Sequence, residues 1–198
     1  MEPAPKARTG RDRLRDVGTT IVLTISLFFV LQTFVAQPYR VEGASMETTL
    51  MPGTFVLIDK LTPRWAPYAR GDIVVFHPPG RSASRGGTPF IKRVIGLPGD
   101  RVELRDGAVY VNGVRLDEPY LYPRGGRPGG TDPEDGSSWR VSDDELFVMG
   151  DHRDDSSDSR DFGPIAISSV IGRAALRYWP LDAFGTFSRQ TYPELAAG

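Results

Sequence analysis

Residues 72–77 read DIVVFH and residues 90–97 read FIKRVIGL, two short runs rich in β-branched and aromatic residues. Runs of this kind, bounded by glycine, proline and aspartate, are typical of β-strands. TFVLID at 54–59, ELFVMG at 145–150 and VIGRAALRYWP at 170–180 repeat the pattern. The part of the chain that follows residue 37 is therefore predicted to be built of short strands.

The composition agrees with one modest β-rich domain. The 198 residues include 22 glycines and 17 prolines, which favours turns over a helical bundle. The net charge of −1 argues against a nucleic-acid binder that relies on phosphate contacts, so no nucleic acid is expected as a partner. The absence of cysteine excludes disulfides, thiolate metal sites and a cysteine nucleophile. We expect neither a bound metal nor a cofactor.

Residues 17–36 read VGTTIVLTISLFFVLQTFVA and contain no charge. A helix of about 20 residues spans roughly 30 Å of hydrocarbon, so this segment is predicted to be a transmembrane anchor. A buried core helix and a cleavable signal peptide are the alternatives. A cut after Ala36 would place the bulky Phe34 three residues upstream, where small residues are needed, which disfavours the signal peptide.

The N-terminal tail, residues 1–16, is rich in basic residues. It carries Lys6, Arg8, Arg11, Arg13 and Arg15 against Glu2, Asp12 and Asp16. The positive-inside rule therefore keeps this tail in the cytoplasm. We expect a single-pass protein of the cytoplasmic membrane, in contact with the lipid bilayer, whose β domain lies on the outer side.

Turn residues divide the β domain. Asp106-Gly107 and Asn112-Gly113 flank AVYV, so residues 101–116 are predicted to form a small meander. Residues 78–89 and 122–138 are predicted loops, and no pattern stands out in the tail at 181–198.

The first candidate site residue is Ser45, in GASMETTL at 43–50. A serine becomes a nucleophile only where a base removes its proton. Its surroundings give G-x-S-x-E rather than the G-x-S-x-G of many Ser-His-Asp hydrolases. The chain has only two histidines, His77 and His152, and both are in contexts typical of structural or surface residues. A surface serine in a turn is the alternative.

The second candidate is Lys92, one of only three lysines, which lies inside an apolar strand pattern. A lysine amine among apolar groups can lose its proton near neutral pH, whereas an arginine cannot. Strand alternation places Lys92 on the opposite face from Ile91 and Arg93. A snorkelling or salt-bridged lysine is the alternative.

The third candidate is the acidic segment GDHRDDSSDSRDFGPI at 150–165. A calcium loop is disfavoured, because Arg153 falls in a ligand position and Phe162 replaces the glutamate expected at the twelfth position. We expect a turn-rich segment braced by Asp–Arg pairs that places a serine hydroxyl against another polar group. A solvated acidic loop is the alternative.

These three segments, in this order after an N-terminal anchor, resemble the type I signal peptidase family, membrane-bound serine proteases that remove signal peptides from exported preproteins. The resemblance rests on Ser45-Met46, RGDIV at 70–74, IKRVIGLPGD at 91–100 and GDHRDDSSDSR at 150–160. It implies an all-β, mostly antiparallel peptidase domain behind a single transmembrane helix. It divides this part of the chain into a catalytic domain at 37–102 and 141–180 and a small accessory insertion at 103–140.

The resemblance also assigns roles to residues. It implies that Ser45 is the nucleophile and Lys92 its general base. It also implies that Ser156 forms a hydrogen bond with Lys92 and orients it, and that Asp158 and Arg160 form a supporting salt bridge. It implies shallow pockets that favour an Ala-x-Ala sequence before the cut, in a substrate that adds as an extended strand. The matching pocket positions are Tyr39, Val41, Gly43, Met46, Leu50, Phe90 and Ile91. The backbone N–H of Ser45 should belong to the oxyanion hole. At Gly43 some relatives have a serine hydroxyl that serves as a second donor.

Two positions depart from the family pattern, Thr48 in place of a proline and His152 in place of an asparagine. Neither changes a group that would transfer a proton. The competing hypothesis is a catalytically inactive, anchored β domain that binds exported proteins, which the presence of both Ser45 and Lys92 opposes. The expected partners in either case are secreted preproteins, and the sequence predicts no oligomeric state.

Overall fold

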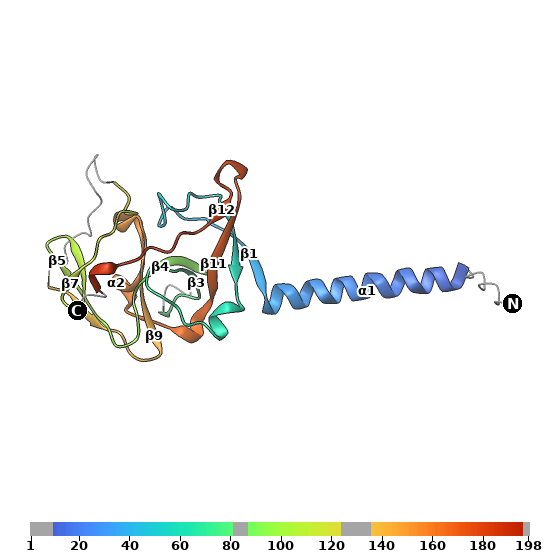
Figure 1. Ribbon diagram of the computed structural model, residues 1–198, viewed down its shortest axis with the longest axis horizontal. Helices are drawn as coiled ribbons and strands as arrows, with labels where there is room; N and C mark the ends of the chain where they lie inside the picture. Colours follow the sequence, from blue (N-terminus) through green and yellow to red (C-terminus); the bar gives the residue numbers. More distant parts are fainter. Residues whose placement is uncertain (1–9, 81–86, 124–135, 196–198) are drawn as a thin grey trace.

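The computed structural model describes residues 10–80, 87–123 and 136–195, which form one long helix and two β-sheets (Figure 1). Helix α1 (Gly10–Phe34) projects away from the β domain. The strands are β1 (Ala36–Arg40), β2 (Phe55–Asp59), β3 (Ile73–Phe76), β4 (Phe90–Gly96), β5 (Arg101–Arg105), β6 (Ala108–Val111), β7 (Val114–Arg115), β8 (Ser138–Arg140), β9 (Glu145–Met149), β10 (Ile165–Ala166), β11 (Val170–Trp179) and β12 (Gly185–Thr186). The short helices are α2 (Ser159–Phe162) and the 3₁₀ turns η1 (Thr62–Arg64), η3 (Arg153–Asp155), η4 (Ile167–Ser169), η5 (Leu181–Ala183) and η6 (Pro193–Leu195).

The larger sheet has the order β1-β2-β11-β3-β4-β9-β10, with β12 added beside β11, and every pairing in it is antiparallel. Its central strand β3 is buried on both faces. Ile73 and Val75 pack into one apolar cluster, and Val74 and Phe76 pack into another on the opposite face. This alternation follows from the two-residue period of a strand.

The smaller sheet has the order β7-β6-β5-β8 and is also antiparallel. A third apolar cluster joins it to the larger sheet, because Val102 and Val111 of the smaller sheet share it with Ile95, Phe147 and Met149. The two sheets therefore share a continuous core. The expected all-β, mostly antiparallel fold is confirmed, and the meander expected at 101–116 is present as β5, β6 and β7.

Helix α1 differs in its bounds from the segment 17–36 that the sequence predicts. The helix begins earlier, at Gly10, and ends at Phe34, while Ala36 already belongs to β1. The stretch Arg13–Phe34 is long and apolar enough to cross a membrane, and none of its most apolar window is buried inside the protein. The alternative of a buried core helix is therefore wrong. At its C-terminal end, Lys60 Nζ lies 3.5 Å from the carbonyl oxygen of Gln32 and donates to it.

Parts of the predicted loops and tail fall outside the described residues. Residues 81–86 of the first loop, 124–135 of the second and 196–198 of the tail are not described. The end of the second predicted loop begins strand β8, which pairs with β5. The tail at 181–198, for which the sequence predicts no structure, contains β12, two 3₁₀ turns and the buried side chain of Tyr192.

Candidate active site

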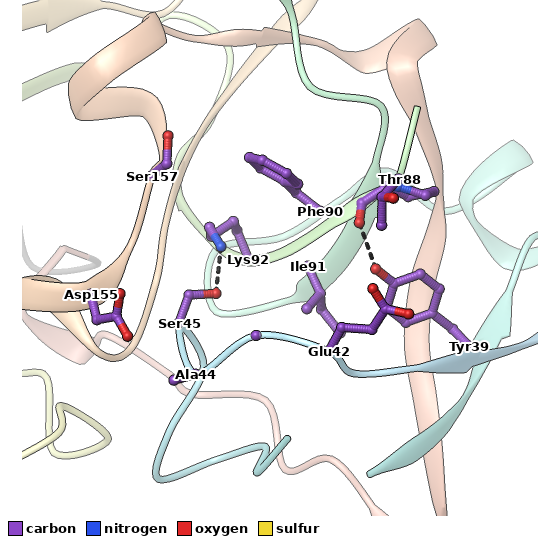
Figure 2. A pocket seen from close by; sticks show the side chains of 12 residues that line it. Tyr39, Glu42, Ala44, Ser45, Thr88, Phe90, Ile91, Lys92, Asp155 and Ser157 are labelled. Atoms are coloured by element: carbon purple, nitrogen blue, oxygen red, sulfur yellow. Dashed lines mark hydrogen bonds between the residues drawn. The ribbon is translucent and has the colours of Figure 1, made fainter. Parts of the chain in front are cut away.

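Ser45 and Lys92 meet at the mouth of a pocket (Figure 2). Ser45 lies in the turns that follow β1, and Lys92 lies on β4, where its backbone pairs with Val74 of β3. The Nζ atom of Lys92 is 2.5 Å from Oγ of Ser45 and forms a hydrogen bond with it. A residue of the turn and a residue of the sheet, far apart in the sequence, are thus in direct contact.

The Lys92 side chain is in an unusual environment for an amine, since the residue is only 4% exposed. Burial lowers its pKa from the ordinary 10.5 to about 8, and the carboxylates of Asp158 and Asp151 limit the shift because they favour the charged form. A substantial fraction of this amine is therefore neutral near physiological pH. A neutral amine next to a hydroxyl can accept its proton.

The backbone around Ser45 is held by the acidic segment. The amide of His152 donates to the carbonyl oxygen of Ser45 at 3.0 Å. At Gly150 a Cβ atom would overlap both that carbonyl oxygen and Oγ of Ser156. The acidic segment therefore packs backbone to backbone against the serine, and only glycine fits at this point.

Asp158 organises the acidic segment from a fully buried position. Its carboxylate accepts from the amide of Gly150 at 2.9 Å, from Oγ of Ser156 at 2.7 Å and from Nε of Arg160 at 2.9 Å. It also caps helix α2 by accepting from the Arg160 amide. Burial alone would raise the pKa of Asp158, but the hydrogen bonds and charge of Arg160 outweigh it and hold the pKa below the ordinary value. The carboxylate is therefore charged and fully satisfied.

The structure thus brings together Ser45, Lys92, Ser156, Asp158 and Arg160, the five residues to which the sequence assigns catalytic or supporting roles. The resemblance implies a hydrogen bond between Ser156 and Lys92, but the hydroxyl of Ser156 donates instead to Asp158 at 2.7 Å, and among the described residues the Lys92 amine is hydrogen-bonded to Ser45. Asp158 in turn acts on Lys92 through its charge. The predicted Asp–Arg bracing of this segment is present in the pair Asp158–Arg160.

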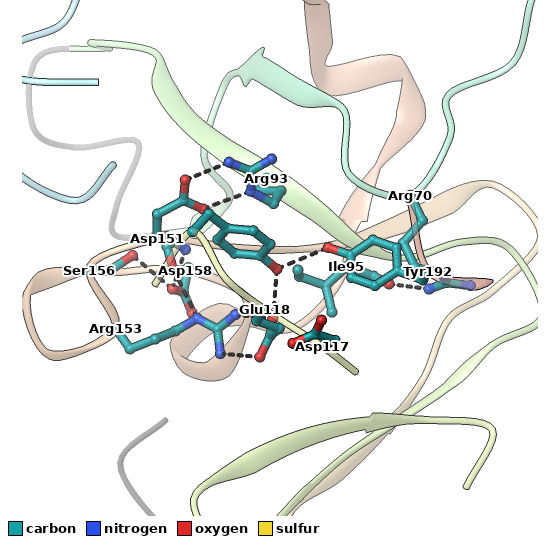
Figure 3. A network of polar contacts seen from close by, with 12 residues as sticks. Arg70, Arg93, Ile95, Asp117, Glu118, Asp151, Arg153, Ser156, Asp158 and Tyr192 are labelled. Atoms are coloured by element: carbon teal, nitrogen blue, oxygen red, sulfur yellow. Dashed lines mark hydrogen bonds and ion pairs between the residues drawn. The ribbon is translucent and has the colours of Figure 1, made fainter. Parts of the chain in front are cut away.

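A second polar network lies beside the first and was not predicted from the sequence (Figure 3). Arg93, the neighbour of Lys92 on β4, forms a two-pronged ion pair with Asp151, at 2.8 and 2.6 Å. Oγ1 of Thr49 donates to Asp151 at 2.5 Å and accepts from Arg93 at 3.2 Å. Asp151 thereby ties the acidic segment to the turn that carries Ser45.

The same network extends to residues that follow β7. Glu118 is ion-paired with Arg153 and accepts from the hydroxyl of Tyr120 at 2.7 Å. Nε of Arg153 donates to the carbonyl oxygen of Gly150 at 3.0 Å. The only sequence signal for these residues is the alternation of arginine and aspartate at 150–161, which does not tell which partners lie outside that segment.

The pocket next to Ser45 has a volume of about 410 Å³. Its walls include four of the seven predicted pocket residues, Tyr39, Gly43, Phe90 and Ile91. They also include Glu42, Ala44, Thr88, Pro89, Asp155 and Ser157, which the sequence did not single out. Figure 2 shows Asp155 and Glu42 on opposite sides of Ser45. The hydroxyl of Tyr39 donates to the carbonyl oxygen of Pro89 at 2.5 Å and joins two walls.

The other three predicted pocket residues need a correction. Val41, Met46 and Leu50 are fully buried and belong to an apolar core cluster together with Val56 and Ile58. They do not line the pocket. Residues 42–45 line the pocket, whereas the residues on either side of them, Val41 and Met46, face the core, and the sequence pattern does not show where this change of direction falls.

One edge of β4 lies open beside the pocket. Residues 90–93 of β4 pair with β3 on one side, whereas β9 pairs with β4 only from Arg93 onward. The backbone of residues 90–92 therefore has no strand partner on the β9 side among the described residues. An open edge of this kind can accept an extended peptide as an additional strand.

Neither histidine has the position of a base. His77 is exposed and lies at the end of β3, and its amide donates to Ser169. The ring of His152 stacks on Tyr122 with 3.9 Å between centroids, and its Nδ1 lies 3.4 Å from a carboxylate oxygen of Glu47. Among the described residues no group of side chains could hold a metal ion.

Comparison with known proteins shows which family the chain resembles. Residues 14–179 match the model of the family described as signal peptidase, peptidase S26. The chain is 39% identical to signal peptidase I of Bacillus caldolyticus, over 90% of this chain and 96% of that protein. It is 32% identical to signal peptidase IB of Staphylococcus aureus, over 83% and 89%. A crystal structure of a signal peptidase I from Enterococcus faecalis V583 aligns with a TM-score of 0.43 at 34% identity, over 55% of this chain and 97% of that one.

Proposed function

The chain belongs to the signal peptidase family, peptidase S26, and we propose that it cuts preproteins after small residues with Ser45 as nucleophile and Lys92 as general base. The contact of 2.5 Å between the serine hydroxyl and a buried amine is the observation that carries this proposal. The pKa of Lys92, lowered to about 8, gives the amine the neutral form that a base needs.

The reaction begins when the neutral amine of Lys92 takes the proton of the Ser45 hydroxyl. The oxygen of Ser45 forms a bond to the scissile carbonyl carbon, whose oxygen becomes negatively charged. The C–N bond then breaks, and the protonated Lys92 gives its proton to the leaving amine. A water molecule, deprotonated by the same lysine, then attacks the ester carbon of the acyl-enzyme. The bond between this carbon and the Ser45 oxygen breaks, Lys92 returns the proton to that oxygen, and the new carboxyl group is released.

The negative oxygen of the tetrahedral intermediate needs a hydrogen-bond donor. The backbone N–H of Ser45 is the donor that we assign to it. The hydrogen bond from His152 to the Ser45 carbonyl and the close packing of Gly150 hold the peptide that follows Ser45, so the Ser45 backbone that carries this N–H is fixed on one side, which supports the assignment. Gly43 contributes no hydroxyl at the position where some relatives have a serine.

The substrate lies extended along the open edge of β4 and directs its side chains into the pocket. Tyr39, Phe90 and Ile91 limit the space there, and larger side chains at the positions one and three before the cut would clash with them. The chain therefore prefers Ala-x-Ala or similar small residues. The peptide hydrogen bonds to β4 are independent of sequence, which suits an enzyme with many substrates.

Helix α1 holds this site close to a membrane. The helix ends at Phe34 and β1 begins at Ala36, so Ser45 follows shortly after the membrane-spanning segment. The basic residues of the tail support an orientation with the N-terminus in the cytoplasm and the β domain on the outer side. Preproteins emerging from the membrane would meet the site there.

A cleavage assay tests the proposal. The full-length protein in detergent is incubated with a preprotein, and the mass of the new N-terminus is measured for the wild type, Ser45→Ala and Lys92→Ala. We expect a cut after Ala-x-Ala that is lost in both variants. Persistent cutting by either variant refutes the assigned dyad, and no cutting by a folded wild type favours an inactive binding domain.

A further inference from the structure

The last part of the described chain, residues 185–195, contacts both sheets and is called the C-terminal strap below. Its first residues form β12 beside β11. Nε of Arg189 lies 2.9 Å from Asp72, just before β3, and Glu194 accepts from the amide of Asp117 at 3.0 Å, just after β7. The strap lies outside residues 14–179, which match the family model.

The strap packs closely against the residues that hold Arg93. At Gly71, which has a φ of +86°, a Cβ atom would overlap the carbonyl oxygen of Gln190 in the strap. The carbonyl oxygen of Gly71 accepts from Nη1 of Arg93 at 3.1 Å. Gly71 thus contacts both the strap and Arg93, the arginine of the second polar network.

Tyr192 is the strap residue that enters the core. It is 8% exposed and belongs to the apolar cluster shared by the two sheets. Its hydroxyl lies 3.0 Å from that of Tyr120. Tyr120 uses its single hydroxyl proton to donate to Glu118, so Tyr192 is the donor in the pair. Burial raises the pKa of Tyr192 to about 12, and the phenol therefore keeps its proton at physiological pH.

Through Arg93, Tyr120 is connected to two segments that contact Ser45: the turn that carries it and the acidic segment. The Arg93 guanidinium lies over the Tyr120 ring, 3.9 Å from its centroid. Arg93 binds Asp151 and Thr49. Thr49 follows Ser45 in the same turn, and Asp151 follows Gly150, which packs against the Ser45 carbonyl.

We propose that Tyr192 is a positioning residue for peptide cleavage, which fixes Ser45 relative to Lys92 through Tyr120, Arg93 and the two partners of Arg93. The proposal rests on the Ser45–Lys92 dyad proposed above. Tyr192 does not line the pocket next to Ser45. It therefore acts on the rate of the chemical step and leaves substrate binding unchanged.

The size of the effect follows from the geometry of the dyad. Proton transfer between Ser45 and Lys92 depends on a close contact, and a misplacement of about 1 Å can cost 100-fold in rate. Loss of one neutral hydrogen bond lowers the population of the ordered arrangement about fivefold. We expect Tyr192→Phe, which keeps the ring and removes the hydroxyl, to lower kcat about fivefold at constant KM.

The experiment measures kcat and KM of the full-length enzyme in detergent on a peptide containing Ala-x-Ala. The variants are Tyr192→Phe, Tyr120→Phe and the double variant. Tyr110→Phe is the matched control, because Tyr110 lies on β6 under Arg105 and its hydroxyl has no partner among the described residues. Thermal unfolding is recorded for each protein, and rates are compared well below the lowest melting temperature.

The double variant distinguishes positioning from separate packing defects. If the hydroxyls act in one chain of contacts, the double variant loses no more kcat than the more damaged single variant. Three results would each overturn the proposal. The first is a loss of kcat in the double variant equal to the product of the two single losses. The others are a changed KM with constant kcat, and a wild-type kcat, in Tyr192→Phe. Should Tyr192→Phe fail to fold, Tyr120→Phe is used in its place: a lower kcat at constant KM supports the proposal, and a wild-type kcat overturns it. Ser45→Ala is run in parallel: if it still cuts, the dyad is wrong, whereas failure of the tyrosine variants alone leaves the dyad intact.

Discussion

A lysine amine serves as a base near neutral pH only where its charged form is destabilised. At Lys92 burial does this, and the two carboxylates that act on it most strongly, those of Asp158 and Asp151, are themselves neutralised by Arg160 and Arg93. Were either carboxylate unpaired, its full charge would favour the ammonium form and oppose the effect of burial. The surrounding ion pairs therefore help to keep the lysine reactive.

The pH dependence of cleavage should follow Lys92. Its pKa is lowered to about 8, so the neutral form that acts as a base is lost as pH falls. We expect kcat/KM to rise up to about pH 8 and to fall about tenfold per pH unit below it. A rate that is flat between pH 6 and pH 9 would contradict this. Lys92→Arg, which keeps a cation but cannot act as a base, should be inactive at every pH at which the protein is folded.

Asp158→Asn should affect both stability and the pH profile. The pKa of Asp158 lies below its ordinary value in the folded protein, so its charge stabilises the fold above the unfolded-state pKa. This contribution is lost as pH falls through the folded-state pKa. Removing a buried partner of Arg160 should cost about 3 kcal/mol of unfolding free energy at pH 7, measured by denaturant titration.

The same substitution removes a charge that raises the pKa of Lys92. The acid limb of the kcat/KM profile should therefore move to lower pH, even though the maximum rate falls. An unchanged acid limb would show that Asp158 acts on the site only through packing. Asp143→Asn, in an exposed turn before β9, is the matched control for both measurements.

At the scale of elements, the acidic segment and the turn of Ser45 behave as one unit because they meet backbone to backbone. Gly150→Ala tests this contact. The added methyl would overlap the Ser45 carbonyl oxygen and Oγ of Ser156, so the two segments must separate. We expect at least about a 100-fold loss of kcat. Gly185→Ala, where a Cβ atom meets nothing within 4 Å, should keep normal activity in the same peptide assay.

The sequence predicts best those strands whose own residues are typical of β-structure. β2, β3, β4, β9 and β11 are runs of β-branched and apolar residues, and each coincides with a predicted strand to within a residue or two. β1 was not predicted, because Ala36–Arg40 reads AQPYR and includes a proline. Proline is tolerated there since β1 is an edge strand that pairs only with β2.

The site residues divide in the same way, into those that have a local sequence signal and those that do not. Short motifs single out Ser45, Lys92 and the acidic segment, because the groups of a proton-transfer pair must be of particular types, and the structure brings these three into contact. Arg93, Thr49 and Glu118 were missed, since their importance lies in partners that are distant in sequence. Val41 and Met46 were misplaced for a related reason, because a turn has no fixed period from which a side chain's direction can be inferred.

At the scale of the whole molecule, the exposed apolar helix and the β domain have different requirements. The side chains of α1 such as Leu23, Leu27 and Phe28 are more than half exposed, which is costly in water and favourable in lipid. The proposed catalytic groups, in contrast, need water for the second half of the proposed reaction. The direct junction of α1 with β1 allows the helix to lie in lipid while the site lies in water. This arrangement requires that the β domain lie outside the membrane, on the side where preproteins emerge.

This orientation can be tested cleanly because the chain contains no cysteine. Single cysteines are introduced by Thr9→Cys in the N-terminal tail and by Asp143→Cys in an exposed turn of the β domain, and intact cells are treated with a membrane-impermeant thiol reagent. If the tail is cytoplasmic, as its basic residues imply, only Asp143→Cys is labelled until the cells are opened. The unmodified chain controls for background. Labelling of Thr9→Cys alone in intact cells would reverse the orientation and place Ser45 on the side away from emerging preproteins.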